Sequence, residues 1–179
     1  TAEIDNGGLD AIVVTASGCG TTLKDYGFMF RNDPAYAEKA QKIASLAKDV
    51  TEVVKQFGLP PASDTPDLVV AYHSACSMQH GQQIRDEPKK LLKQAGFVLR
   101  DVPEGHICCG SAGTYSLLQP ELSESLRANK LAALASGGPA RILSSNIGCL
   151  SHLARSSNLP VEHWIEYIDQ KWLNKRSDL

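Results

Sequence analysis

The strongest constraint on the fold is a set of short apolar runs, three of which lead into turns rich in glycine, serine and cysteine. These runs span residues 9–15, 67–72, 97–99 and 141–145. Between and after them, apolar residues recur at helical spacing over residues 33–57, 87–95, 120–135 and 163–175. Strands that alternate with helices are typical of parallel β-α-β units. The sequence therefore predicts an α/β fold with an open, mainly parallel sheet and flanking helices.

Composition and charge exclude several other classes of protein. A chain of 179 residues with 42% hydrophobic and 21% charged residues is ordinary for a globular protein, and it can fold without disulfides or metal. Its net charge of −2 comes without a basic cluster, which argues against nucleic acid as a partner. No apolar run approaches the ~20 residues of a membrane-spanning helix, and no signal peptide is recognised. We therefore expect a cytoplasmic protein without a transmembrane segment.

Two segments of the chain share a pattern. When Cys19 is aligned with Cys149, both segments read as an apolar strand, a polar link, Gly-Cys, two variable residues and leucine. We interpret residues 1–58 as the tail end of a first module plus a long helix, and residues 67–179 as a second, complete module. The proline-rich stretch 58–66 is the predicted boundary between them. We expect one compact unit with a partial internal duplication, and a fragment of a longer protein.

Four of the five cysteines lie in three segments that follow predicted strands. Between these segments lie 31 and 39 residues, each about the length of one strand–helix excursion. Segments that leave the carboxyl ends of neighbouring parallel strands meet at one edge of the sheet, where ligands bind. Thiolates are soft donors that suit zinc, copper(I) and iron–sulfur clusters. We therefore predict a metal site formed by Cys76, Cys108, Cys109 and Cys149.

The adjacent pair Cys108-Cys109 discriminates among these metals. Neighbouring Cα atoms lie ~3.8 Å apart, so two successive side chains cannot easily occupy two vertices of one tetrahedral ion. A multi-iron cluster offers several metal atoms, so consecutive thiolates could bind different ones. Gly110 and Gly113 let the backbone approach closely, and its N–H groups could hydrogen-bond to cluster sulfide. We expect an iron–sulfur cluster, with structural zinc or a catalytic thiol–disulfide site as alternatives.

Several other residues are candidates for additional ligands or for neighbours of the site. His152 follows Cys149 by three residues, an offset that places both on one face of a helical turn. His73 and His80 flank Cys76, and each is a candidate hydrogen-bonding neighbour or ligand. Cys19 belongs to the first module, whose other cysteines are absent.

Three motifs surround the clustered cysteines. They are Ala71-Tyr72-His73 with Cys76 and Gln79-His80-Gly81, then Cys108-Cys109-Gly110-Ser111-Ala112-Gly113-Thr114-Tyr115, and finally Asn146-Ile147-Gly148-Cys149 with His152. These motifs resemble the cysteine-rich "CCG" domain family. The domain occurs in one of the subunits of heterodisulfide reductase and in the iron–sulfur subunits of glycolate and lactate dehydrogenases, and the motifs look most like the glycolate oxidase type.

The resemblance implies the carboxy-terminal part of the iron–sulfur subunit of an FAD-linked 2-hydroxy acid dehydrogenase. Electrons would pass from FAD-containing subunits through an iron–sulfur cluster, of 4Fe–4S type, to a membrane acceptor such as the quinone pool. This implies a place at the inner membrane held by partners, and a fragment that is itself inactive on the hydroxy acid. An aerobically prepared fragment could also be metal-free.

One departure from the family pattern bears on the cofactor. His152 stands where the heterodisulfide reductase branch has a fifth cysteine. The resemblance therefore favours a four-cysteine cluster, or zinc, over a centre that cleaves disulfides.

Overall fold

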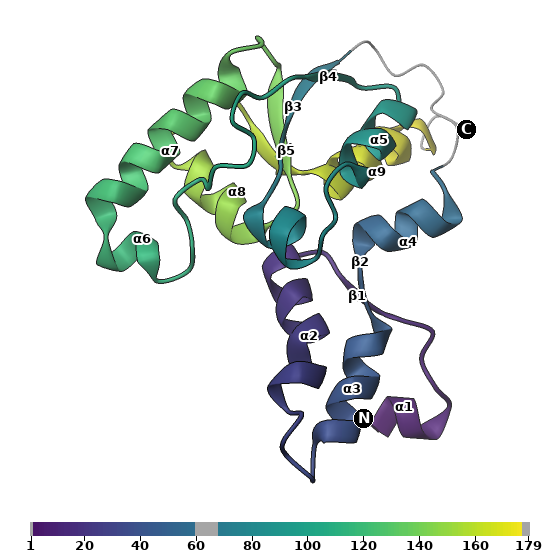
Figure 1. Cartoon of the computed structure of the whole chain (residues 1–179). Helices are drawn as coiled ribbons and strands as arrows, with labels where there is room; N and C mark the ends of the chain where they lie inside the picture. Colours follow the sequence, from purple (N-terminus) through teal and green to yellow (C-terminus); the bar gives the residue numbers. More distant parts are fainter. Residues whose placement is uncertain (1, 60–67, 177–179) are drawn as a thin grey trace.

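The main body of the protein is a four-stranded parallel sheet (Figure 1). The computed structural model describes residues 2–59 and 68–176. Each strand of this sheet is parallel to its neighbours. In spatial order the strands are β4 (Val98–Arg100), β3 (Val69–His73), β5 (Arg141–Ser144) and β6 (Val161–His163). The prediction of an α/β fold with parallel strands and flanking helices is confirmed.

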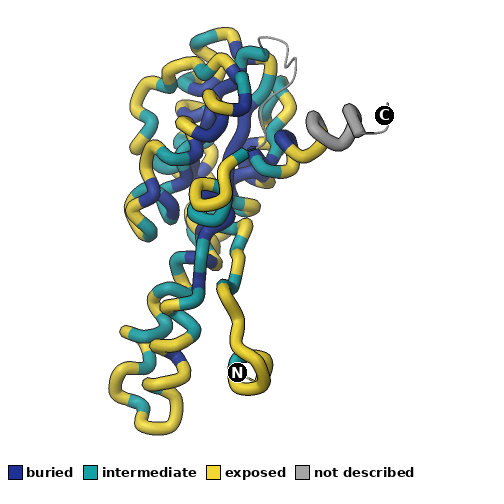
Figure 2. Tube along the Cα trace, turned by 90° about the vertical axis from the view of Figure 1, so that its right-hand side faces the viewer, coloured by how far each residue is buried: buried dark blue, intermediate teal, exposed yellow. Residues whose placement is uncertain are grey.

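A smaller parallel pair precedes this sheet in the chain. It consists of β1 (Ile12–Val14) and β2 (Ala47–Asp49), and the short helix α1 (Ala2–Asn6) lies ahead of it. Between the two strands, α2 (Ser17–Met29) and α3 (Ala37–Leu46) form a hairpin that projects away from the main body (Figure 1). The far end of this hairpin is mostly exposed, whereas buried residues concentrate in the main body (Figure 2).

Helices cover both faces of the larger sheet. One face packs against α4 (Val50–Phe57), α5 (Glu87–Gln94) and α9 (Trp164–Arg176), and the other against α7 (Pro120–Ala135) and α8 (Ile147–Ala154). Successive strand residues alternate between the two faces. Val70 and Tyr72 accordingly join the first apolar cluster, whereas Ala71 joins the second. The remaining elements are the π-helical turn η1 (Ser77–Gly81) and the short helix α6 (Tyr115–Leu118).

The prediction of one long helix over residues 33–57 is wrong, because β2 divides it into α3 and α4. Asp49 ends the strand and begins α4 by accepting a hydrogen bond from the backbone N–H of Thr51 at 2.8 Å. The side chain of Glu52 accepts from the backbone N–H of Asp49, also at 2.8 Å, which completes a capping box. The strand β6 was likewise not predicted. Most of the proposed connection over 58–66 lies outside the described residues.

The two segments with a shared sequence pattern also share a succession of elements. The first runs from β1 through α2 and α3 to β2, and β2 leads directly into α4. The second runs from β5 through α8 to β6, and β6 leads directly into α9. In both, the two strands are parallel neighbours. The helix α3 has no counterpart in the second segment. The division of the chain into two modules stays a prediction.

We predict that Asp49→Ala lowers the free energy of unfolding by about 1 kcal/mol, because α4 loses its amino-terminal cap. Asp49→Asn retains a side-chain oxygen that can accept from Thr51, so its stability should lie closer to that of the unaltered chain. Urea denaturation followed by circular dichroism measures both. Equal stability of the two variants would contradict a capping role.

Candidate metal centre

The cysteines lie at the point where the order of strands in the sheet reverses. The chain leaves β3 toward β4 on one side, and it later returns to form β5 on the other side of β3. Loops that leave two such strands diverge, and ligands bind in the crevice between them. Cys76 follows β3, Cys108 and Cys109 lie in the loop after β4, and Cys149 lies in the first turn of α8 after β5.

The four thiols form a continuous group. Cys108 contacts the side chains of Cys109 and Cys76, and Cys109 contacts Cys149. Cys109 and Cys149 are buried, whereas Cys76 and Cys108 are half-buried. The structure thus brings together all four cysteines that the sequence singled out. Their role as ligands stays a prediction.

Hydrogen bonds within this group concentrate negative charge on one sulfur. The Cys109 and Cys76 thiols donate to Cys108, and the backbone N–H of Gly110 donates to the same Sγ at 3.3 Å. These contacts lower the pKa of Cys108 far below its ordinary value. The pKa values of Cys76 and Cys109 are raised by the same contacts and by burial. The arrangement therefore favours a thiolate at Cys108 that its neighbours stabilise.

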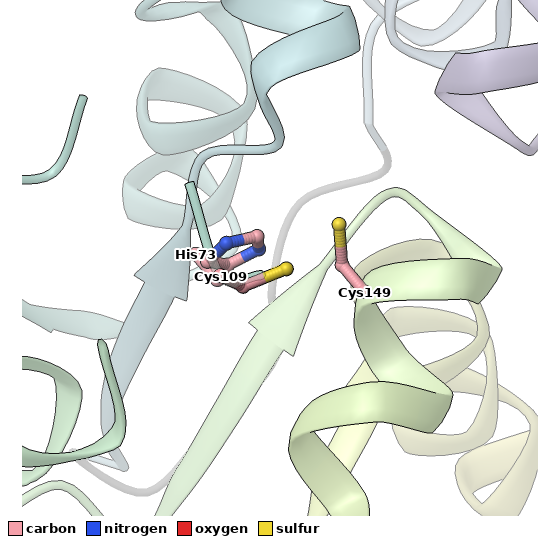
Figure 3. Close-up of side chains that lie close together, drawn as sticks. All are labelled: His73, Cys109 and Cys149. Atoms are coloured by element: carbon pink, nitrogen blue, oxygen red, sulfur yellow. The ribbon is translucent and has the colours of Figure 1, made fainter. Parts of the chain in front are cut away.

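His73 joins the thiols because of strand register. It ends β3 opposite Ser144 of β5, and alternation places both on the face that carries Ala71. The ligating atoms of His73, Cys109 and Cys149 all lie within 4.8 Å of one another. Figure 3 shows these three side chains around one space, with Cys149 reaching it from α8.

Hydrogen bonding determines the tautomer of His73. The Ser144 hydroxyl donates its single hydrogen to the His73 carbonyl at 3.1 Å, and the same Oγ lies 2.9 Å from His73 Nδ1. Nδ1 must therefore carry the proton, which leaves the lone pair on Nε2. Burial and the nearby charge of Lys130 lower the pKa of His73 to about 4. At neutral pH this imidazole is uncharged, the form that binds metal.

The loop after the cysteine doublet requires glycine at position 110. Gly110 has a φ of +89°, and a Cβ there would collide with the backbone carbonyl oxygen of Ser123 on α7. The Ser123 hydroxyl in turn donates to the Gly110 carbonyl at 2.8 Å. This close approach fixes the doublet against α7. Gly113 has a φ of +58°, but a Cβ there would meet nothing within 4 Å.

Asn146 connects the loops around the site. Its Oδ1 accepts from the backbone N–H groups of Gly148 and Cys149 at 2.9 and 3.2 Å, which caps α8. Its Nδ2 donates to the hydroxyls of Ser17 and Ser77 at 3.1 and 3.3 Å. One amide thus holds together the starts of α8, α2 and η1.

The other three predicted histidine and cysteine residues occupy different environments. His152 is buried on α8, with Nε2 3.3 Å from the Ser123 hydroxyl, and burial lowers its pKa. Cys19 on α2 and His80 in η1 are exposed. The structure places His73 with Cys109 and Cys149, whereas the role of His152, which shares α8 with Cys149, stays a prediction.

Sequence reasoning missed two residues. Asn146 occupies the position before a helix that begins with Ile147, and an asparagine there is a recognisable cap signal. Lys130 is buried on α7, and its Nζ donates to the Glu104 carbonyl at 2.9 Å. It stands four residues after Leu126 and four before Leu134, so a charged residue at a position of helical apolar spacing was the available signal.

We predict that Gly110→Ala destabilises the chain by about 3 kcal/mol, because the added methyl group meets the α7 backbone at a left-handed φ. Gly113→Ala is the matched control, since it carries only the cost of the left-handed conformation, about 1 kcal/mol. Thermal unfolding measures both variants. Equal losses of stability would contradict the close approach to Ser123.

None of the helices in the described parts of the chain is long and apolar enough to cross a membrane.

Comparison with known proteins relates the chain to iron–sulfur subunits. It is 46% identical over 163 residues to the glycolate oxidase iron-sulfur subunit of Escherichia coli (strain K12), covering 91% of this chain and 40% of that protein. It is 31% identical over 146 residues to the probable glycolate oxidase iron-sulfur subunit of Bacillus subtilis (strain 168), covering 79% and 33%.

A further relative is the lactate utilization protein A of Bacillus subtilis (strain 168), 29% identical over 167 residues, with 89% of this chain and 70% of that protein covered. The chain spans less than half the length of the two glycolate oxidase subunits. Residues 70–154, which include all four clustered cysteines, match the family described as "Cysteine-rich domain". Through these residues the chain contains a segment that matches the cysteine-rich (CCG) domain family.

Proposed function

We propose that the chain is part of the iron–sulfur subunit of an FAD-linked 2-hydroxy acid dehydrogenase of the glycolate type. Cys76, Cys108, Cys109 and Cys149 would hold a 4Fe–4S cluster. The observation that carries the proposal is the meeting of these four thiols, from three separate loops, where the strand order reverses. The names of the relatives support a role as an iron–sulfur subunit.

The donor set fits an iron–sulfur cluster. All four donors are soft sulfur atoms. The two adjacent cysteines have different neighbours, since Cys108 contacts Cys76 while Cys109 contacts Cys149. Consecutive thiolates that face different partners suit a centre with several metal atoms better than a single ion. The backbone N–H of Gly110 already donates to the Cys108 sulfur, a contact of the kind that tunes cluster potentials.

In this role a bound cluster would supply one-electron transfer, and the polypeptide would position and shield it. Cys109 and Cys149 lie in the apolar cluster between the sheet and its helices, which limits access of water on that side. Electrons would arrive from FAD-containing subunits of the same complex and leave toward a membrane acceptor, the quinone pool. The complex would be cytoplasmic and peripheral to the inner membrane. This chain would not bind the hydroxy acid.

One observation favours zinc as a second candidate. His73, Cys109 and Cys149 place one nitrogen and two sulfur donors within 4.8 Å of one another, and His73 is neutral at pH 7. Nitrogen and thiolate donors at this separation suit a structural zinc ion. In that case the module would dock partner subunits without transferring electrons.

Anaerobic reconstitution with iron and sulfide tests the proposal. We expect about four irons per chain, a visible absorbance band and an electron paramagnetic resonance signal after reduction. Cys108→Ser should lose the signal and most of the iron, because it removes one of the four proposed thiolate ligands. Cys19→Ser, at an exposed cysteine outside the group, is the matched control and should load fully.

Full cluster loading of Cys108→Ser would contradict the assignment. One stoichiometric zinc without a chromophore, lost in Cys109→Ser and in His73→Ala, would establish the zinc candidate instead.

A further inference from the structure

A buried cation without an ion-pair partner among the described residues, Lys130 of α7, is hydrogen-bonded to the loop that carries the cysteine doublet. Lys130 is 3% exposed, and its Nζ donates to a backbone carbonyl, that of Glu104, at 2.9 Å. The ion pairs found within residues 2–59 and 68–176 all join other side chains. A carbonyl dipole offsets only part of the cost of removing an ammonium group from water. This site therefore favours a source of negative charge close to Lys130.

The cysteine doublet lies in the same loop as Glu104, whose carbonyl Lys130 binds, and Cys108 follows Glu104 by four positions. Burial lowers the pKa of Lys130, while Cys109 and Cys108 act in the opposite direction, ahead of the Glu104 carboxylate. The positive charge of Lys130 also helps to lower the pKa of His73. The ammonium group, the doublet and the imidazole thus form one electrostatic unit between α7 and the end of β3.

We propose that Lys130 is the counter-ion of the centre held by the doublet and that it raises the reduction potential of that centre. The proposal rests on the proposed function, because it concerns a cluster bound by the four cysteines. A cluster with four thiolate ligands is negatively charged and gains a further negative charge on reduction. A fixed cation in a poorly solvated position stabilises the reduced form more than the oxidised form.

The balance of the step is simple. One electron enters from the reductant, which is the partner flavin in the proposed complex and dithionite in the test below. No bond forms or breaks, and Lys130 neither takes up nor releases a proton. Lys130 is a positioning residue in this scheme, since it acts on the centre through its charge.

The alternative is that Lys130 only fastens the loop of residues 102–109 to α7 through its hydrogen bond. Three variants separate charge from hydrogen bonding. Lys130→Arg keeps the charge, Lys130→Gln keeps a donor without charge, and Lys130→Met removes both while retaining the aliphatic length. Lys42→Met is the matched control, because Lys42 is exposed on α3 and its loss changes the net charge equally.

The test is a dithionite titration of the reconstituted chain, followed by electron paramagnetic resonance. In Lys130→Met and Lys130→Gln we expect reduction to become about tenfold less favourable, ~59 mV lower for a one-electron couple. Lys130→Arg and Lys42→Met should stay near the unaltered potential. The melting temperature of metal-free Lys130→Met should equal or exceed that of the unaltered chain, because an unpaired buried charge is gone.

Three results would overturn the proposal, and they are distinguishable. If the neutral variants load a cluster at an unchanged potential, the counter-ion role fails while the proposed function stands. If the neutral variants unfold without metal while Lys130→Arg folds, Lys130 serves only to stabilise the fold through its contact with the loop of residues 102–109. If the unaltered chain assembles no cluster at all, the proposed function fails, and this inference fails with it.

Discussion

The register of β3 against β5 determines which side chains reach the cysteines. His73 and Ser144 are paired across these strands, and their hydrogen bond lies on the face shared with the thiols. Tyr72, one residue before His73, is hydrogen-bonded at 2.5 Å to Ser145, which directly follows Ser144. A slip of one residue would exchange the two faces and present a tyrosine to the sulfur atoms. These two hydrogen bonds therefore stabilise the observed register of β3 against β5. That register determines which side chains lie beside the cysteines.

Positive groups approach the sulfur atoms from several directions. The N–H of Gly110 donates to Cys108, and the buried Lys130 is hydrogen-bonded to the loop that carries the doublet. Cys149 lies in the first turn of α8, where the helix dipole presents its positive end. Such surroundings favour thiolates or another negatively charged group over neutral thiols. The electrostatics of the chain therefore support a metal–thiolate centre independently of the cysteine count.

The sequence was sufficient to predict the general position of the site because one topological rule applies to every parallel sheet. Strand ends could be read from apolar runs, and the cysteines that follow them had to meet at one edge. Finer features depend on contacts that no local pattern contains. The helical spacing of residues 33–57 continues through Ala47–Asp49, and only pairing with β1 selects the extended conformation there.

The dependence on long-range contacts also explains why the sequence pointed to His152 as the main candidate histidine, whereas the structure places His73 with two of the cysteines. An offset of three residues pointed to His152, whereas the position of His73 follows from the register of two strands separated by about 70 residues of chain. Lys130 was missed for a related reason. Its helical position is apolar by pattern, and only the packing of α7 against the loop of Cys108 and Cys109 reveals what its charge faces.

The shared amide of Asn146 bears on how the chain can be divided. The segment that matches the domain family ends at residue 154 and begins at residue 70, yet Asn146 reaches outside it to the hydroxyl of Ser17. Excision at the family boundaries would remove that acceptor together with β6, the strand that borders β5. The segment that matches the family is thus shorter than the unit joined by these contacts, and an excised segment would expose the edge of β5 close to the clustered cysteines.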